Sequence, residues 1–478
     1  MENKPFSKKR SCPQMENQFF PRKVPGFCSF RYGISVLLHF CNGVVMAQRT
    51  CLSLTMVVMV NATQSLPNIS SGEHPGNIMN PVYNWSPDIQ GIILSSIFYG
   101  TMIVQVPIGY LSGIYSIKNM IVWGLFLGSV FSLCIPPAAQ VGETLVIVCR
   151  VAQGMAQGTI IAAQHHIWVQ WAPPLEQGRL TTISLSGIHL GPFIVLLVTG
   201  FICDLLGWPF VFYIFGAYGC VLCLFWYVLF YDDPKNHPCI SINEKEYITS
   251  SLAQQVSSSN LTTLPIKAML QSLPLWAIFL CNFANIWTSN FTLMYTPILI
   301  NSIAHVNMRE NGLLSSLAPL FAYIISILGG QIADFLRSRN ILSTITIRKL
   351  FTTLGMLFPV IFSMCMLYLS FNFYSIIICL IFANATTAFV FSGVQINALD
   401  IAPRFYGFLK GVSSVIGMVG GILSSTVTGL ILNEDPETSW YKIYFLMSAI
   451  NMLALIFYLI FAKAEIQDWA KESQETRL

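Results

Sequence analysis

Charged residues are scarce in this chain, and their scarcity excludes a soluble globular protein. Of the 478 residues, 10% are charged and 54% are hydrophobic. A soluble domain carries about 25% charged residues, because charge covers the surface that meets water. Uncharged apolar segments recur along the whole sequence, each near the ~20 residues that a helix needs to cross a bilayer. The short alternating segments of a membrane β-barrel are missing, so we expect an all-α polytopic membrane protein.

The sequence also lacks the patterns of an enzyme or a metal site. The 13 cysteines form no spaced framework, and the CxxC pattern at Cys220 and Cys223 lies in an apolar segment, where cysteine packs as a small hydrophobe. No HExxH motif, phosphate-binding loop or nucleophile–base pair is found. We therefore expect no catalysis, no metal and no cofactor. Nothing in the sequence supports nucleic-acid binding.

The apolar segments predict twelve transmembrane helices in two sets of six. The expected helices are 34–60, 88–113, 118–138, 143–170, 179–204, 208–231, 270–302, 311–336, 345–369, 372–398, 405–432 and 439–463. The domain organisation follows from these spans. We expect a tail (1–33), a first bundle (34–231), a polar loop (232–268), a second bundle (269–464) and a second tail (465–478).

The distribution of lysine and arginine predicts the orientation in the membrane. The N-terminal tail is rich in both residues, whereas the segment 61–87 between the first two spans has none. Because cytoplasmic loops are enriched in positive charge, we expect both termini in the cytoplasm and the 61–87 loop outside. That loop carries sequons at Asn61, Asn68 and Asn84, which are expected glycosylation sites.

Two short segments repeat at matching positions in the two halves. "GYLSGIYSIK" begins at Gly109 after the second span, and "GGQIADFLRSR", with Gly330, Asp334 and Arg337, follows the eighth. "WAPPLEQGR" after the fourth span likewise corresponds to "DIAPRFYG" after the tenth. Such repeats are typical of transporters built by duplication, which bind substrate near the membrane midplane between the halves.

Polar stripes on two expected helices indicate what would be bound there. An arginine at membrane depth costs about 2.5–3.5 kcal/mol on insertion scales and is retained where it faces a wet cavity or a partner. No carboxylate lies well inside any span, so the two arginines within the spans, Arg49 and Arg150, predict an anion site. The alternative is that they are structural arginines capped by backbone carbonyls. The stripes are His39, Asn42, Arg49 and Ser53 in the first span, and Arg150, Gln153, Gln157 and Gln164 in the fourth.

The segment "GQIADFLRSR" resembles the cytoplasmic loop motif of the major facilitator superfamily. "NWSPDIQGIILSS", "WAPPLEQGRL", "GWPFVFYIFG" and "NALDIAPRFYGFLKG" are similar to its anion:cation symporter branch, which includes type I sodium–phosphate cotransporters, sialin and vesicular glutamate transporters. The resemblance covers nearly the whole chain. In the first copy of the loop motif, Gly113 and Ile114 replace the usual Asp and Arg, which predicts a weaker salt-bridge latch in the N-terminal half.

The resemblance implies roles for particular residues. Arginines at the positions of Arg49 and Arg150 are linked in the family to recognition of an anionic substrate. Proton-coupled members carry glutamate at Gln157, and glutamate transporters carry histidine at Leu94 and arginine at Asn285. These departures predict transport driven by membrane potential or sodium rather than by protons, with sodium or chloride as a coupled or modulating ion.

The resulting prediction is a secondary active transporter of organic anions such as urate or aryl anions, of phosphate with sodium, or of both. An anion channel selective for chloride is the alternative, since arginine-lined pores suit channels as well. An ending in Thr476, Arg477 and Leu478 matches a PDZ ligand and predicts an apical plasma membrane location. Further candidates, each with a structural alternative, are Trp287, Tyr99, Tyr295, Asn397, His165, His166 and His189, while Lys410 is expected to reach the cytoplasmic surface.

Overall fold

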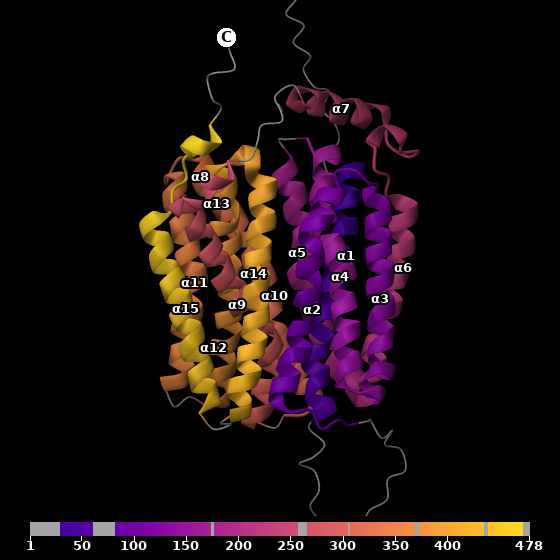
Figure 1. The fold of residues 1–478 in the computed structure, drawn as a ribbon, viewed down its shortest axis with the longest axis vertical. Helices are drawn as coiled ribbons and strands as arrows, with labels where there is room; N and C mark the ends of the chain where they lie inside the picture. Colours follow the sequence, from indigo (N-terminus) through magenta and orange to yellow (C-terminus); the bar gives the residue numbers. More distant parts are fainter. Residues whose placement is uncertain are drawn as a thin grey trace, which may run out of the picture.

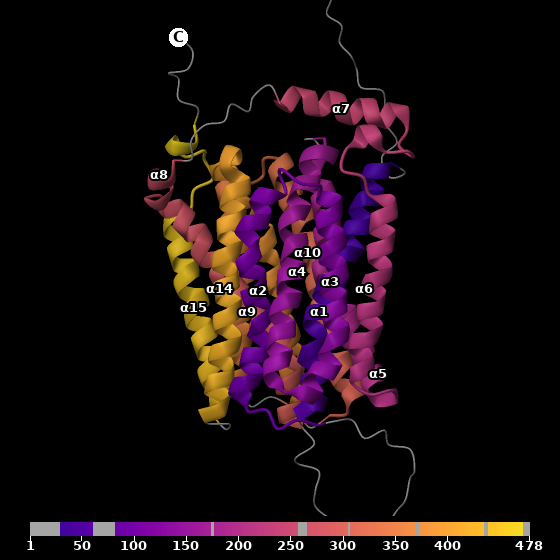
Figure 2. The same ribbon diagram turned by 45° about the vertical axis from the view of Figure 1, so that its right-hand side comes forward.

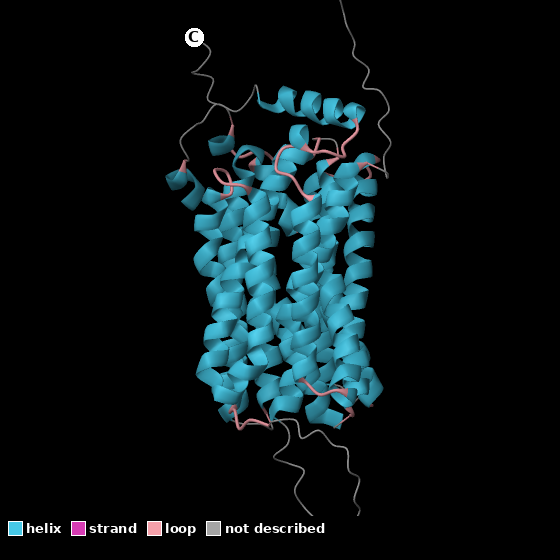
Figure 3. Cartoon of the chain, turned by 90° about the vertical axis from the view of Figure 1, so that its right-hand side faces the viewer, coloured by secondary structure: helices cyan, strands magenta, loops and turns pink. Residues whose placement is uncertain are grey.

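The computed structural model describes residues 29–60, 82–173, 176–256, 265–304, 306–368, 372–434 and 438–471, and every regular element in these ranges is a helix. Long helices stand side by side in one upright bundle (Figure 1), and the view coloured by secondary structure shows the same architecture from another side (Figure 3). The expectation of an all-α membrane protein is confirmed.

The N-terminal half comprises α1 (Phe30–Val60), α2 (Pro87–Leu111), α3 (Ile117–Val141), α4 (Glu143–Trp171), α5 (Gln177–Leu205) and α6 (Pro209–Leu229). The C-terminal half comprises α9 (Leu273–Ala304), α10 (Met308–Ser338), α11 (Thr344–Tyr368), α12 (Phe373–Ala385), α13 (Val394–Ile401), α14 (Tyr406–Glu434) and α15 (Ser439–Phe461). Within the described residues, eleven segments are long and apolar enough to span a membrane, with Phe373–Ile401 counted as one segment. With α9 they make the twelve expected spans.

Helix α9 falls outside that set because it is rich in asparagine, yet it runs inside the bundle. Its asparagines Asn282, Asn285 and Asn290 are buried. The amide nitrogen of Asn290 donates to Ser424 Oγ and Ser425 Oγ of α14, each at 2.8 Å. The polar groups of α9 are thus directed at neighbouring helices instead of lipid, as buried polar groups in a membrane must be.

The tenth span is broken, whereas the sequence predicts a continuous helix over 372–398. A 3₁₀ segment (Thr386–Phe391) separates α12 from α13. Gly393 explains the break, because a β carbon there would lie 2.3 Å from Thr352 Oγ1 and 2.7 Å from Thr352 N of α11. The backbone approaches α11 more closely at this point than a regular helix with side chains could.

The segment 232–268, expected as a polar loop, contains two α-helices. They are α7 (Ile242–Val256) and α8 (Ile266–Leu270). Helix α7 lies across one end of the bundle, over the N-terminal half (Figures 1 and 2). We call this end of the bundle the linker end and the opposite end the far end.

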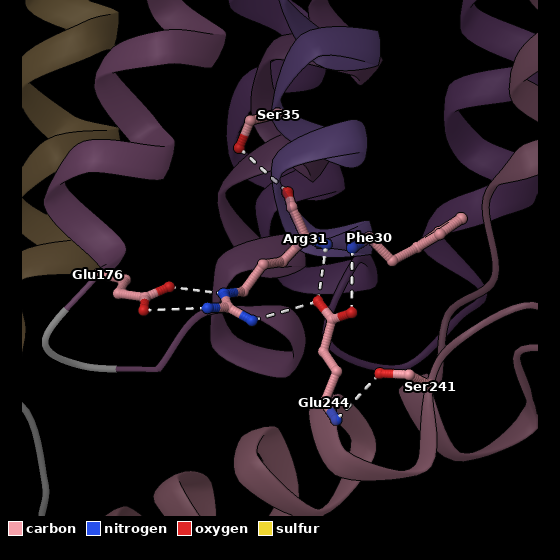
Figure 4. A network of polar contacts seen from close by, with 6 residues as sticks. All are labelled: Phe30, Arg31, Ser35, Glu176, Ser241 and Glu244. Atoms are coloured by element: carbon pink, nitrogen blue, oxygen red, sulfur yellow. Dashed lines mark hydrogen bonds and ion pairs between the residues drawn. The ribbon is translucent and has the colours of Figure 1, made fainter. Parts of the chain in front are cut away.

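A buried ion network fixes α7 to the N-terminal half at the linker end (Figure 4). Arg31, at the start of α1, donates to Glu176 from Nε at 2.5 Å and from Nη2 at 3.0 Å, and to Glu244 of α7 from Nη1 at 3.3 Å. The Glu244 carboxylate also accepts from the backbone N–H groups of Phe30 and Arg31 at 3.0 and 3.1 Å, so it caps the N-terminus of α1. Burial, with the negative field of Glu176, raises the pKa of the neighbouring Tyr247.

Replacing Arg31 by glutamine is expected to destabilise the protein strongly, because two carboxylates would lose their buried cation. The Arg31 and Glu244 side chains are 1% and 4% exposed, and breaking a buried pair on one side costs about 3–5 kcal/mol. The melting midpoint in detergent should fall by about 5–10 °C. Glu246→Gln is the matched control, since Glu246 is exposed on the same helix. Equal midpoints for Arg31→Gln and this control would contradict the assigned role.

The two halves are joined at the far end and separate at the linker end. One hydrophobic cluster contains residues of both halves, among them Cys51 of α1 and Phe291 of α9. At the linker end, in contrast, each half has a cluster of its own. Arg309 of α10 also pairs with Asp204 of α5 at 2.6 Å beside the far end. The structure is therefore open toward the linker end.

Gly91 provides a test of this closure, because a β carbon there would lie 2.7 Å from Ser425 O and 3.0 Å from Gly429 Cα of the opposite half. Overpacking costs about 1–3 kcal/mol, so Gly91→Ala should shift the population away from the state closed at the far end about fivefold or more. A cysteine introduced at position 165, whose native side chain is exposed, should then react more slowly with a maleimide applied from the linker end.

The control for this shift is Gly33→Ala, since no atom lies within 4 Å of a β carbon at Gly33. Unchanged labelling in Gly91→Ala, or equal slowing in both variants, would contradict the assignment of the far-end closure to this helix crossing.

Candidate functional site

Arg49 lies in the middle of α1 and points between α2 and α4. Its Nε donates to Gln157 Oε1 at 2.8 Å, and its Nη2 donates to Thr101 Oγ1 at 3.0 Å. The third nitrogen, Nη1, has no hydrogen-bond partner among the described residues. No ion pair within the described part of the chain includes Arg49. The guanidinium is thus held by neutral oxygens and keeps one end for a ligand.

The direction of the surrounding network follows from Arg49, because arginine can only donate. Gln157 must present its oxygen to Arg49, so its nitrogen donates to Gln48 Oε1 at 3.0 Å. Gln48 then donates to Ser129 Oγ and to the Phe215 carbonyl, each at 3.1 Å. The network crosses α1, α3, α4 and α6 without a titratable side chain, so its geometry holds at any physiological pH.

Arg150 is bound differently from Arg49. It is 0% exposed, and its Nη1 and Nη2 donate to the carbonyls of Gln48 and Arg49 at 3.4 and 3.3 Å. Nη1 also donates to Gln153 Oε1 at 3.1 Å, while Nε has no partner. This is the backbone-capping arrangement that the sequence left open as the alternative. Arg150 therefore ties α4 to α1 directly behind Arg49 and adds positive potential there.

The rest of the stripe on α1 continues toward the linker end. The Asn42 amide donates to Gln164 Oε1 and to the Ser184 carbonyl, each at 3.0 Å. His39 Nδ1 lies 2.9 Å from Ser186 Oγ of α5. Ser53, by contrast, donates only to the Thr50 carbonyl of its own helix. The structure thus brings most of both stripes together between α1, α4 and α5.

Among the candidates of the C-terminal half, Asn285 fits an open site best. It is 4% exposed, and its Oδ1 is buried with no partner. Trp287, 6% exposed, packs on Phe283 of the same helix with ring centroids 6.0 Å apart. Two other candidates have structural partners. Asn397 donates to Tyr458 Oη of α15 at 2.9 Å, and Tyr295 donates to the Ser425 carbonyl at 2.9 Å.

Two residues of the site were missed from the sequence. Gln48 and Thr101 hold the arginine network, but Gln48 lies one residue away from the stripe on α1 and Thr101 is a lone hydroxyl in an apolar span. Lys410, which was expected to reach the cytoplasmic surface, is half-buried at the linker end. Its Nζ donates to Gln395 Oε1 inside the C-terminal half. The signal available in the sequence was that each of these residues is a polar side chain inside an expected span.

The repeated loop motifs occupy equivalent places at the ends of α2 and α10. Gly109 and Gly330 have open space where a β carbon would lie. Asp334 and Arg337 are exposed, and neither forms an ion pair within the described ranges. The linker-open structure thus shows no latch at this motif. Asn84 is exposed next to α2 at the far end, whereas Asn61, Asn68, Thr476, Arg477 and Leu478 lie outside the described residues.

Comparison with known proteins agrees with this architecture. A family model described as Major Facilitator Superfamily matches residues 38–364. The chain is 64% identical over 466 residues to sodium-dependent phosphate transport protein 1 of Oryctolagus cuniculus, over 97% of this chain and 100% of that protein. It is 45% identical over 469 residues to a Homo sapiens protein named probable small intestine urate exporter, over 95% of this chain and 94% of that protein.

Among solved structures, the fold resembles a bacterial homologue of the human lysosomal transporter Spinster in an inward-facing and occupied conformation. The TM-score is 0.66 at 13% identity, over 94% of this chain and 100% of that chain. Identity this low supports the fold alone.

Proposed function

We propose, from the premise that this chain belongs to the Major Facilitator Superfamily, that it moves small anions across a membrane by alternating access around Arg49. The chain is a multi-pass transporter of anions. In alternating access, the two halves close at one end as they open at the other. In this structure one cluster joins the halves at the far end, and separate clusters lie at the linker end. This is one of the two states that the mechanism requires.

The observation that carries the proposal is the unneutralised guanidinium of Arg49. Its partners Gln157 and Thr101 contribute no negative charge. A planar guanidinium binds carboxylate or phosphate through paired hydrogen bonds. We propose that Arg49 binds the substrate through Nη1 together with the second N–H of Nη2, whose first N–H is held by Thr101, with Asn285 and Trp287 completing the site from α9. Arg150 and Gln157 position Arg49, and Asn42 holds α1 against α4 and α5, whereas Asn397 contributes to the packing of the C-terminal half.

The substrates are proposed from the same chemistry and from the names of the relatives. Phosphate with sodium, and urate or other organic anions, suit a site that offers a guanidinium and an aromatic ring. Because Gln157 cannot titrate, membrane potential or sodium is the proposed driving force, with chloride as a modulating ion. The channel alternative is not favoured, since the far-end cluster closes the path that a channel would leave open.

The linker end is proposed to face the cytoplasm. Helix α1 begins there and α15 ends there (Figure 2), so both tails would be cytoplasmic. Asn84 would then be exposed outside as a glycosylation site, together with Asn61 and Asn68. Thr476, Arg477 and Leu478 would bind a PDZ scaffold and retain the protein in the apical plasma membrane.

The proposal is tested by uptake of labelled phosphate and labelled urate into liposomes that contain the purified protein. Gradients of potential, sodium, chloride and pH are imposed one at a time. Saturable uptake that follows potential or sodium supports the proposal. Uptake that follows only an imposed proton gradient would contradict the role given to Gln157, and uptake of neither anion would contradict the substrate class.

A further inference from the structure

Lys410 is a cation within the C-terminal half that the transport site at Arg49 does not use. It lies in the second turn of α14, and its Nζ donates to Gln395 Oε1 of α13. No ion pair to Lys410 exists among the described residues. The carboxylate on the same helix as Gln395, that of Asp400, is paired with Arg348 Nε at 2.7 Å. The ammonium is therefore positioned but not neutralised.

The orientation of Gln395 is fixed from its other side. Its nitrogen donates to Asn282 Oδ1 at 2.5 Å, and the Asn282 nitrogen donates to the Ser413 carbonyl at 2.6 Å. These hydrogen bonds run from Ser413 of α14 through Asn282 of α9 to Gln395 of α13. They leave Gln395 presenting one neutral oxygen to Lys410. Since an ammonium has three donors, donors remain for a ligand.

Lys410 lies near the start of α14 at the linker end, where each half has a hydrophobic cluster of its own. His165 of α4, in the opposite half, is exposed and lies within the positive field of Lys410 and of His166. On either side of Lys410, a β carbon at Gly407 or Gly411 would meet no atom within 4 Å. Both halves thus place a polar side chain at the linker end, Lys410 from the C-terminal half and His165 from the N-terminal half.

We propose a second anion-binding site at the linker end, formed by Lys410 and Gln395 with His165 opposite, that binds small anions on their path to or from Arg49. The proposal rests on the proposed transport function and adds an access site to it. The ammonium of Lys410 is a point charge that water can reach, and it raises the local concentration of anions. Arg49, farther from the linker end, binds them through a planar guanidinium of fixed geometry. An anion leaving Arg49 toward the linker end therefore meets a second cation before it reaches bulk water.

The test measures the apparent KM for phosphate and for urate from each side, in liposomes whose protein has been oriented. Lys410→Gln should raise the linker-side KM about fivefold to tenfold. The reason is that a partly hydrated charge attracts an anion through an effective dielectric constant of about 20. The far-side KM and the rate at saturation should change by less than about twofold. Raising the salt concentration should reduce the difference between parent and variant, since salt screens a charge that water reaches.

Three variants separate this site from other effects. Lys349→Gln removes one positive charge at the same end, but Lys349 donates to the Leu459 carbonyl on α15, away from the opposite half; its linker-side KM should match the parent. Gln395→Glu neutralises Lys410 in place and should raise the linker-side KM as Lys410→Gln does, which keeps the test valid if Lys410→Gln fails to fold. Lys410→Arg, which keeps the charge, should remain close to the parent.

An unchanged linker-side KM in Lys410→Gln, or an equal rise in Lys349→Gln, would overturn the proposal. Failure of the transport function is distinguishable, because the parent would then carry neither anion from either side. Loss of transport from both sides is expected for substitution of Arg49 and not for substitution of Lys410.

Discussion

Arg49→Ala should reduce saturable anion uptake at least about a hundredfold while the protein still reaches the membrane. The substitution removes the cation that the substrate contacts, and a hydrogen bond to a charged group contributes about 1.5–3 kcal/mol. Two such bonds correspond to a factor of about one hundred or more. It also leaves Gln157 Oε1 and Thr101 Oγ1 without the donor that they share.

Arg49→Lys separates charge from shape. Lysine presents a point charge and cannot donate to Gln157 and Thr101 while keeping a planar edge for substrate, so we expect less than about a tenth of parental uptake. Surface labelling controls for delivery, and Lys349→Gln controls for the loss of one positive charge elsewhere. Parental uptake in Arg49→Lys would refute a bidentate role for Arg49.

Gln157→Glu should convert a pH-independent carrier into one that works best in acid. Gln157 Oε1 accepts from Arg49 Nε at 2.8 Å, so a carboxylate at this position would form an ion pair with Arg49 and compete directly with the substrate. We expect uptake to fall about tenfold or more at pH 8, where the carboxylate is ionised. Position 157 is 1% exposed, and burial disfavours the ionised carboxyl and opposes the effect of Arg49, so uptake should rise as the pH falls and protonation removes the negative charge, whereas the parent should vary little.

The measurement is urate uptake between pH 5 and 8 in both proteins, with the membrane potential clamped. Gln153→Glu is the comparison, because Gln153 accepts from the structural Arg150 and not from Arg49. A parent that is already driven steeply by protons would show that another group, such as His39 or His189, couples protons to transport.

The membrane spans could be predicted from the sequence because a helix in lipid must satisfy its own backbone with a long apolar segment. The lack of a carboxylate partner for Arg49 could also be predicted, since no carboxylate lies well inside any expected span. The prediction of helices and loops was incomplete where contacts between distant segments outweigh the local sequence pattern. The break at Gly393 depends on the approach of α11, and α7 is held across the end of the bundle by the contact of Glu244 with Arg31, which is more than two hundred residues earlier in the chain.

The comparison of Arg49 with Arg150 shows most clearly what could not be predicted from the sequence. Arg49 and Arg150 look equivalent in sequence, as single cations on polar stripes. Their difference lies in the rotation of each helix. Arg150 points at carbonyls of α1, while Arg49 points at side chains of α2 and α4 and keeps Nη1 unpaired. Spacing places residues on a common face, but the packing of neighbouring helices decides which face lines the path.

Trans-stimulation of urate exchange tests most directly whether one site is exposed alternately at the two ends of the bundle. Liposomes loaded with labelled urate are held at zero potential, and unlabelled urate is added outside. Alternating access around Arg49 predicts that efflux of label accelerates and saturates with the added urate, and that Arg49→Ala abolishes the acceleration. Efflux that is indifferent to external urate, together with single-channel current steps in planar bilayers, would contradict the account.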